Sequence, residues 1–244
     1  MADIELRVLG SGDAFGDGGR LQTCIWLRTG HYQALLDCGA TSLVAMKRFG
    51  IEPNEIDAVL ISHFHGDHFG GLPYLILDGQ FRGRTRPLAI GGPPHVQEHV
   101  RAHLEATFPG ASRTHQRFPL SFEVLSATGV RLGPLRVSAL PVAHTPGSEA
   151  LGLRVEAASR TVAYSGDTEW TPALVELSAG ADLFVCEAYS YDKRVPYHLD
   201  YRTLEQHASA LTAAGLLLTH LGPEMLVPHE LRFPLASDGL RVPL

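Results

Sequence analysis

Residues 62–68 read SHFHGDH and follow directly on the apolar run DAVLIS at residues 57–62. The apolar run is typical of a buried strand. The loop after it carries four potential metal ligands within six residues: His63, His65, Asp67 and His68. Imidazole nitrogens suit zinc and similar cations, and a carboxylate adds negative charge that helps to hold a divalent ion. This stretch therefore predicts a metal centre at the end of a strand.

Three further ligand-type residues also follow apolar runs that predict strands. They are His144 after Val137–Val142, Asp167 after Thr161–Ser165, and His220 after Leu216–Thr219. Taken singly, each histidine fits a hydrogen-bonded loop residue better than a ligand. Because α/β sheets place their sites at the carboxyl ends of strands, three such residues at equivalent positions favour convergence on the first cluster.

Strand and helix patterns alternate along the whole chain. The expected strands are Ile4–Leu9, Gln22–Arg28, Tyr32–Asp37, Asp57–Ser62, Leu88–Ile90, Phe122–Leu125, Leu135–Pro141, Gly152–Val155, Thr161–Ser165, Asp182–Glu187 and Leu216–Thr219. The expected helices are Ser42–Phe49, Leu72–Asp78, Val96–Thr107, Pro172–Ser178 and Thr203–Ala214. This order predicts sheets covered by helices, in one α/β domain over residues 1–244 whose two halves divide near residue 125.

Bulk properties restrict the class of protein. With 45% hydrophobic and 19% charged residues, the composition is that of a globular protein, and the net charge of −6 argues against a nucleic-acid-binding surface. Neither a long apolar run nor a signal-peptide pattern is present, so we expect a cytoplasmic protein without a membrane span. The three cysteines form no CxxC pair, which predicts buried free thiols rather than disulfides.

The chain resembles the metallo-β-lactamase superfamily. HFHGDH at 63–68, followed in order by His144, Asp167 and His220, carries the resemblance, which extends to LLDCG at 35–39, YSGDT at 164–168 and CEAYS at 186–190. The opening LGSGDAF at 9–15 is similar to the ribonuclease Z-like branch, which includes small phosphodiesterases. The resemblance implies an αββα four-layer sandwich, in which two mixed β-sheets are flanked by helices.

The resemblance also implies a dinuclear site that holds a hydroxide between two divalent cations. These ions are expected to be zinc, with manganese or iron as alternatives. One metal would take His63, His65 and His144, the other Asp67, His68 and His220, with Asp167 bridging both. A homodimer is a further implication.

Two residues are assigned to catalysis, Asp67 and His198. A histidine at the position of His198 in the ribonuclease Z-like branch acts as a proton donor or charge stabiliser near the scissile phosphate; a surface loop residue is the alternative. Asp37, in LLDCG, either orients a ligand histidine or stabilises the turn at Gly39, and the sequence leaves both open.

The substrate class follows from two departures from that branch. Ribonuclease Z enzymes carry a tRNA-gripping arm between the residues that match His144 and Asp167, and this chain is too short there to contain one. GDTEW at 166–170 also lacks the basic residue usual after GDT. We therefore expect a small anionic phosphodiester, such as a cyclic nucleotide or cyclic sugar phosphate, rather than tRNA. A lactone, thioester or sulfate ester is the alternative substrate, and a non-catalytic metal-binding scaffold the alternative class.

A run of arginines and a set of regularly spaced histidines are interpreted as structural rather than functional. Arg82, Arg84 and Arg86 form a basic run that suits an anionic substrate, although a solvated connector is the favoured interpretation. His95, His99 and His103 recur every four residues on a predicted helix, where an exposed helix face is favoured over a metal site.

Overall fold

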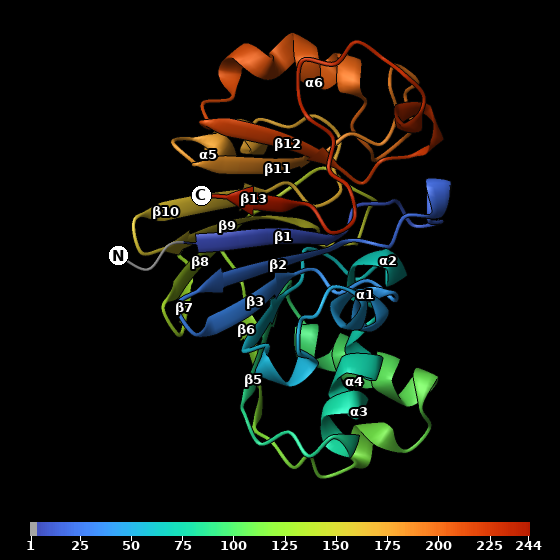
Figure 1. Cartoon of the computed structure of the whole chain (residues 1–244), viewed down its shortest axis with the longest axis vertical. Coiled ribbons are helices and arrows are strands. Elements are labelled where there is room, and N and C mark those ends of the chain that lie inside the picture. The colour runs from blue at the N-terminus through green and yellow to red at the C-terminus, as the bar shows by residue number, and fades with distance from the viewer. Residues whose placement is uncertain (1–3) are drawn as a thin grey trace.

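Two facing β-sheets form the centre of the structure, a computed structural model that describes residues 4–244 (Figure 1). Residues 1–3 of the predicted domain lie outside the described residues. The first sheet has the order β13-β1-β2-β3-β4-β5-β6. Its strands are β1 (Ile4–Gly10), β2 (Cys24–Thr29), β3 (Tyr32–Leu36), β4 (Ala58–Leu60), β5 (Leu88–Gly92), β6 (Leu120–Val124) and β13 (Arg241–Pro243).

The second sheet has the order β12-β11-β10-β9-β8-β7. Its strands are β7 (Val130–Leu132), β8 (Leu135–Pro141), β9 (Leu151–Ala157), β10 (Arg160–Tyr164), β11 (Leu183–Glu187) and β12 (Gly215–Thr219). Both sheets are mixed, since β3 to β6 and β10 to β12 pair in parallel and the other neighbours pair antiparallel. The chain passes from the first sheet to the second between β6 and β7, near residue 125, and returns to the first sheet at β13.

Helices cover the outer face of each sheet (Figure 1). They are α1 (Ser42–Arg48), α2 (Gly66–Phe69), α3 (Leu72–Phe81), α4 (Val96–Thr107), α5 (Ala173–Ser178) and α6 (Tyr201–His207). Side chains alternate along a strand, so Leu27 of β2 packs between the sheets while its neighbour Trp26 packs with α1, α3 and α4. In the same way Val185 of β11 lies between the sheets and Phe184 packs with α5 and α6. These layers confirm the αββα sandwich.

The prediction of a helix over Thr203–Ala214 was wrong in its extent. The Asp200 side chain accepts a hydrogen bond from Thr203 N at 2.8 Å and caps the helix, so α6 begins at Tyr201. It ends at His207, where a 3-10 turn over Ala208–Ala210 follows, and Ala214 N then donates to Ala181 O as the chain enters β12. That contact is remote in sequence and is invisible to helical periodicity.

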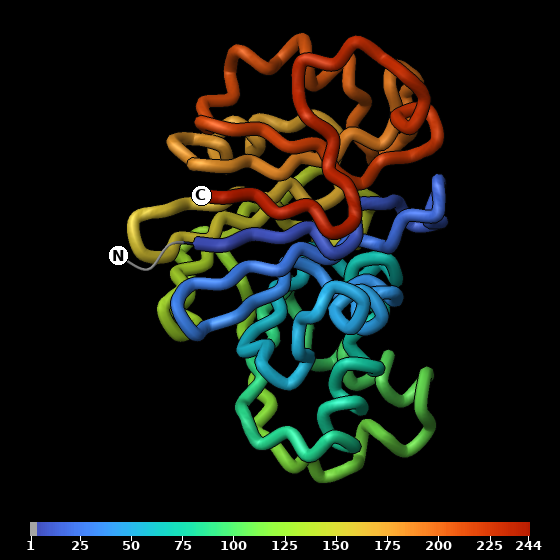
Figure 2. Tube along the Cα trace, in the orientation of Figure 1, coloured from blue at the N-terminus to red at the C-terminus, as the bar shows by residue number. Residues whose placement is uncertain are grey.

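Two short strands were not predicted, β7 and β13. Gly133, at a φ of 58°, allows the tight turn that pairs β7 with β8. β13 brings the C-terminal segment beside β1, with Leu6 opposite Val242, and the two segments run side by side in Figure 2. Neither of these two segments carries enough alternation or apolar character to be recognised as a strand from sequence.

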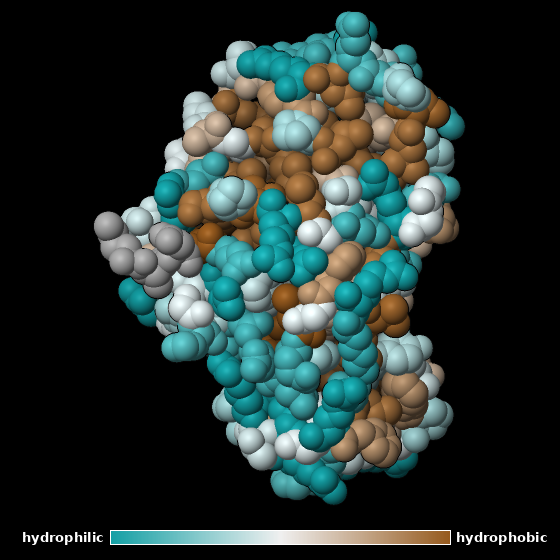
Figure 3. Space-filling view, viewed as in Figure 1, coloured by the Kyte–Doolittle hydropathy of each residue, from teal (hydrophilic) through white to brown (hydrophobic). Residues whose placement is uncertain are grey.

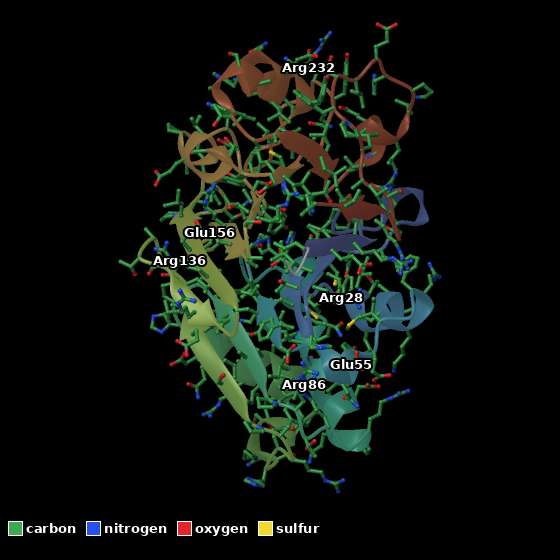
Figure 4. The ribbon with its side chains drawn as sticks, turned by 60° about the vertical axis from the view of Figure 1, so that its left-hand side comes forward. Arg28, Glu55, Arg86, Arg136, Glu156 and Arg232 are labelled. Atoms are coloured by element: carbon green, nitrogen blue, oxygen red, sulfur yellow. The ribbon has the colours of Figure 1, made fainter. Side chains whose placement is uncertain are left out.

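Polar and apolar residues separate on the face shown in Figure 3. Apolar side chains gather over the upper half, around β11, β12 and the C-terminal segment, and hydrophilic residues dominate below. Exposed charges pair across strands, as Arg136 of β8 does with Glu156 of β9 at 3.6 Å (Figure 4). None of the helices within residues 4–244 combines the length and apolar character needed to cross a membrane. All three cysteines are free and buried, as predicted.

Candidate active site

The directions of the strands bring the predicted ligands to one edge of the sandwich. In the second sheet β8, β10 and β12 run the same way, so the loops that follow them meet. These loops carry His144, Asp167 and His220. The loop after β4 of the first sheet joins them, because Leu151 N donates to Ser62 O at 3.0 Å.

All seven predicted metal-ligand positions lie together in two adjacent groups. The first group is His63, His65 and His144, and the second is Asp67, His68, Asp167 and His220. Within each group the potential ligand atoms lie within 4.8 Å of one another. Asp167 Oδ2 lies 3.3 Å from His220 Nε2 and 3.9 Å from His63 Nε2, so this carboxylate lies between the two groups.

Four of the five histidines in these groups form a hydrogen bond through Nδ1, the ring nitrogen that points away from the other ligand atoms. His68 Nδ1 donates to Asp37 Oδ2 at 2.7 Å, and His144 Nδ1 donates to the Tyr197 carbonyl at 2.8 Å. Since both acceptors are oxygens without a proton, Nδ1 carries the hydrogen and Nε2 is left free to bind a metal. His63 and His220 are held in the same way by the hydroxyls of Ser62 and Thr23, at 3.0 and 3.3 Å.

The carboxylate of Asp37 is the centre of the hydrogen bonds that surround the ligand histidines. It is fully buried and has a left-handed φ of 58°. Besides His68, its carboxylate accepts hydrogen bonds from Ser62 N and Ser62 Oγ, both at 2.7 Å, and from the Tyr164 hydroxyl at 2.8 Å. Of the two interpretations left open by the sequence, this geometry supports the one in which Asp37 orients a ligand histidine.

Unpartnered polar atoms show that the cluster fits a cation. His63 Nε2 is buried and forms no hydrogen bond within residues 4–244, and buried Asp167 Oδ1 is approached only by the ring of His68, at 3.2 Å. Buried polar atoms normally have partners, and two acceptors that face a common space are satisfied by a positive charge between them. Nitrogen and carboxylate donors in this number suit divalent zinc or a similar ion.

The protonation states of the ligands agree with this fit. Burial and the neighbouring histidines lower the pKa of His63, so that ring stays neutral. Burial raises the pKa values of Asp67 and Asp167, but the nearby histidine charges outweigh it and leave both carboxyls ionised. Neutral imidazoles and ionised carboxylates are the forms that bind metals.

His68 has the most anionic surroundings of these groups. Burial lowers its pKa, but three carboxylates outweigh that effect and raise the pKa well above its ordinary value. These carboxylates belong to Asp167, Asp67 and Asp37. In the absence of a metal the ring therefore holds a second proton, which a bound cation would displace.

His198 lies beside the cluster and is paired with Glu187, a residue that the sequence reasoning missed. His198 Nδ1 lies 3.2 Å from Glu187 Oε2 and 3.9 Å from Asp167 Oδ2. Burial lowers the pKa of His198, but the hydrogen bond and charge of Glu187 outweigh it and raise the pKa to about 9. The sequence signal that could have identified Glu187 is its position at the end of the buried strand β11, which resembles the position of Asp167 after β10.

Three cavities border the cluster. His198 lines one of about 470 Å³, Asp67 one of about 390 Å³, and His144 one of about 620 Å³. Each volume falls within the range of small-molecule sites, roughly 300–1,000 Å³. Two of these cavities therefore reach a ligand residue directly, and the third reaches His198.

The arginine run does not reach this site. Arg84 is buried and donates to the carbonyls of Pro53 and Ile56, at the end of β4 opposite to the cluster, so the interpretation as a solvated connector was wrong for this residue. Arg86, labelled in Figure 4, pairs with Asp57 at the same end.

The histidines of α4 have packing roles. His99 stacks on Phe64 with ring centroids 4.0 Å apart, and His103 Nε2 lies 3.3 Å from Gly70 O. They fasten α4 to the loop that carries the ligands. His95 and His99 are exposed, as predicted, whereas His103 is partly buried.

Known proteins resemble the chain along nearly its whole length. A family model described as anti-Pycsar protein Apyc1 matches residues 4–230. Ribonuclease Z of Mycolicibacterium gilvum (strain PYR-GCK) is 31% identical, over 91% of this chain and 85% of that protein. Ribonuclease Z of Mycobacterium marinum (strain ATCC BAA-535 / M) is 29% identical, over 93% of this chain and 89% of its own.

Solved structures show the same fold. The metallo-β-lactamase fold protein YhfI from Bacillus subtilis has a TM-score of 0.82 at 21% identity, covering 100% of both chains. The short form of human tRNase Z has a TM-score of 0.79 at 22% identity, covering 98% of both. A diphosphatase from the PhnP family has a TM-score of 0.76 at 21% identity, covering 98% of this chain and 97% of that one.

Proposed function

This chain belongs to the family described as anti-Pycsar protein Apyc1, in the ribonuclease Z-like branch of the metallo-β-lactamase superfamily, and on that premise we propose that it hydrolyses a small cyclic phosphodiester. Its relatives mark it as a metal-dependent hydrolase. The substrate class, a cyclic nucleotide or cyclic sugar phosphate, is the new element of the proposal.

The convergence of seven ligand-type side chains on one edge of the sandwich carries this proposal. One divalent cation would be held by the His63 group and another by the group that contains His68, with Asp167 between them. When bound, two such cations supply positive charge that polarises a phosphoryl oxygen and lowers the pKa of a water molecule. We propose zinc as the native metal because imidazole provides most of the donors.

His198 is proposed as the proton donor to the leaving oxygen. Its Nδ1 is engaged by Glu187, so Nε2 is the atom available to a substrate. With a pKa of about 9 the ring is protonated at neutral pH. Asp67, which adjoins His68 at 3.1 Å, is proposed to take part in catalysis as a ligand of the second cation.

Three features support a small substrate over tRNA. The segment between His144 and Asp167 contains only the hairpin of β9 and β10, which leaves no room for an arm. Glu169 stands where the tRNA-processing enzymes have a basic residue, and the net charge is −6. A phosphate-gripping surface would require the opposite charge.

The test is a comparison of substrates with protein loaded with zinc or manganese. We expect hydrolysis of a 3′,5′-cyclic mononucleotide, a cyclic sugar phosphate and bis(p-nitrophenyl) phosphate, and we expect Asp167→Ala to abolish it. Glu98→Gln, on the exposed face of α4, is the control that keeps activity. Turnover of lactones, thioesters or sulfate esters without phosphodiesters would overturn the proposal, as would binding of metal without any hydrolysis.

A further inference from the structure

We propose that the cavity lined by Trp170, His207 and Glu169, next to His198, is the subsite for the nucleobase of a cyclic nucleotide. This inference rests on the proposed phosphodiesterase function and specifies it. It assigns a role to the Glu169-Trp170 pair, in which the chain departs from the tRNA-processing pattern.

An aromatic wall is the first observation. The rings of Trp170 and His207 stack with centroids 4.2 Å apart and planes 8° from parallel. Trp170 follows the loop of Asp167, and His207 ends α6, so two elements remote in sequence build the wall. The cavity of about 470 Å³ has His198 in the same lining, next to the site of chemistry. Every base has a π-face that can stack on such a surface.

Free polar groups in the same lining are the second observation. Glu169 Oε1 accepts a hydrogen bond from Tyr197 N at 2.7 Å, and its carboxylate has no other hydrogen-bond partner within residues 4–244. Arg194 also lines the cavity and forms no side-chain hydrogen bond or ion pair within the described residues. The subsite therefore offers the carboxylate of Glu169 as an acceptor group and the guanidinium of Arg194 as a donor group. Bases present both donors and acceptors at their edges and are read by stacking combined with hydrogen bonds.

The chemistry of a cyclic nucleotide places the base on this side of the cluster. Both ester oxygens of the phosphate belong to one ribose, so the oxygen that His198 protonates is attached to the sugar that carries the base. The ribose must then lie next to His198, within reach of a base bound in this cavity. The cavity beside His144 is larger, but Trp, Tyr and Phe are absent from the residues that line it.

The kinetic test compares two substrates that differ only in the base. They are a 3′,5′-cyclic mononucleotide and the base-free 3′,5′-cyclic phosphate of ribose. Stacking of a base on an aromatic residue is worth roughly 1–3 kcal/mol, or roughly a 5- to 160-fold preference. We expect Trp170→Ala to lower the ratio of the two kcat/KM values by this factor, and Trp170→Phe to retain most of it. Phe81→Ala, which removes a ring that is 81% exposed on α3, should leave the ratio unchanged.

A binding measurement gives a second readout that needs no turnover. The chain has two tryptophans, of which Trp26 is 3% exposed and Trp170 lines the cavity. A nucleoside 5′-monophosphate, the expected type of product, should change the tryptophan fluorescence of metal-loaded protein. Ribose 5-phosphate, which lacks a base, should not. The response should disappear in Trp170→Phe, which identifies Trp170 as the reporter.

The outcomes separate this inference from the proposed function. If the cyclic nucleotide and its base-free analogue are both hydrolysed and Trp170→Ala leaves their ratio unchanged, the subsite is overturned and the phosphodiesterase stands. If neither compound is hydrolysed, the proposed function fails first. A fluorescence change of equal size with ribose 5-phosphate would also overturn the subsite, because the signal would then come from phosphate binding.

Discussion

The buried carboxylate of Asp37 determines which nitrogen of His68 faces the ligand cluster. It accepts the Nδ1 proton at 2.7 Å and is itself held by Ser62 and Tyr164. Groups that orient a metal ligand in this way typically contribute 10- to 100-fold to metal affinity. Asp37 is therefore part of the proposed metal centre, although it lies outside the ligand groups.

Replacement of this carboxylate should weaken metal binding. Asp37→Asn keeps the size of the side chain but removes its charge, so we expect zinc affinity to fall by roughly 10- to 100-fold. Isothermal titration with zinc would measure the change, with Glu98→Gln as the control. Wild-type affinity in a folded Asp37→Asn protein would show that His68 needs no such support.

The pair of His198 and Glu187 sets the pH at which a proton can be donated. Glu187 is buried, and the residue lies close enough to hold His198 in its protonated form. Because the pKa of His198 is raised, to about 9, the protonated ring is present below that value and is lost as pH rises through it. Because of Glu187, His198 therefore remains protonated, and able to donate a proton, throughout the neutral pH range.

Glu187→Gln should move the alkaline limb of the activity profile to lower pH. The substitution removes the charge that raises the pKa of His198, so the pKa falls toward its ordinary value of roughly 6.5. A profile of kcat against pH for bis(p-nitrophenyl) phosphate would show the shift. His198→Asn should remove the limb together with most of the activity. An alkaline limb that stays at the same pH in Glu187→Gln would exclude His198 as the group that titrates.

At the scale of elements, the ligand loop and α2 pack against the turn after β3 through glycine. A Cβ atom on Gly39 would lie 2.2 Å from Asp67 O, and one on Gly71 would lie 2.3 Å from Gly39 O. Cys38 N also donates to His68 O at 2.6 Å. The two segments are in backbone contact, and this contact fixes the height of Asp67 and His68 above the sheet.

Gly39→Ala should therefore damage both stability and metal binding. The methyl group collides with backbone, which cannot move aside as a flexible side chain could, so we expect a loss of roughly 1–3 kcal/mol or more in the free energy of unfolding. Urea denaturation would measure it, and metal content would report the displaced loop. Gly66→Ala is the matched control, because a Cβ there has nothing within 4 Å. Equal stability of the two variants would contradict this account.

At the scale of the whole molecule, β13 covers the edge of the first sheet. It pairs with β1, and Val242 and Leu244 pack against the core between the sheets. An uncovered strand edge pairs readily with other chains. The C-terminal segment thus closes the same sheet with which the described chain begins.

Removal of residues 241–244 should lower the melting temperature and promote aggregation. The deletion exposes the edge of β1 and takes away apolar contacts while it retains the Val8 N to Leu240 O hydrogen bond. Thermal unfolding followed by circular dichroism, together with light scattering, would record both effects. A truncated protein that melts at the wild-type temperature and stays monodisperse would show that β13 contributes nothing to the sandwich.

The sequence by itself determined the features that depend on neighbours along the chain. Alternation of apolar residues located the longer strands, and the spacing of HFHGDH identified a ligand cluster at the end of one of them. The position of His144, Asp167 and His220 directly after apolar runs then favoured their convergence on this cluster, and the structure brings them together. Such patterns can be read because side-chain direction repeats with the geometry of the backbone.

Only the tertiary structure decided the features that depend on partners distant in sequence. The pairing of Glu187 with His198, the burial of Arg84 and the stack of Trp170 on His207 each join segments that no local pattern connects. The path of the chain after α6 is another such feature, because Ala214 N donates to Ala181 O. The role of a charged or aromatic side chain depends on the groups that it contacts. Its burial, its pKa and its hydrogen bonds are set by these tertiary contacts and cannot be read from the residue type alone.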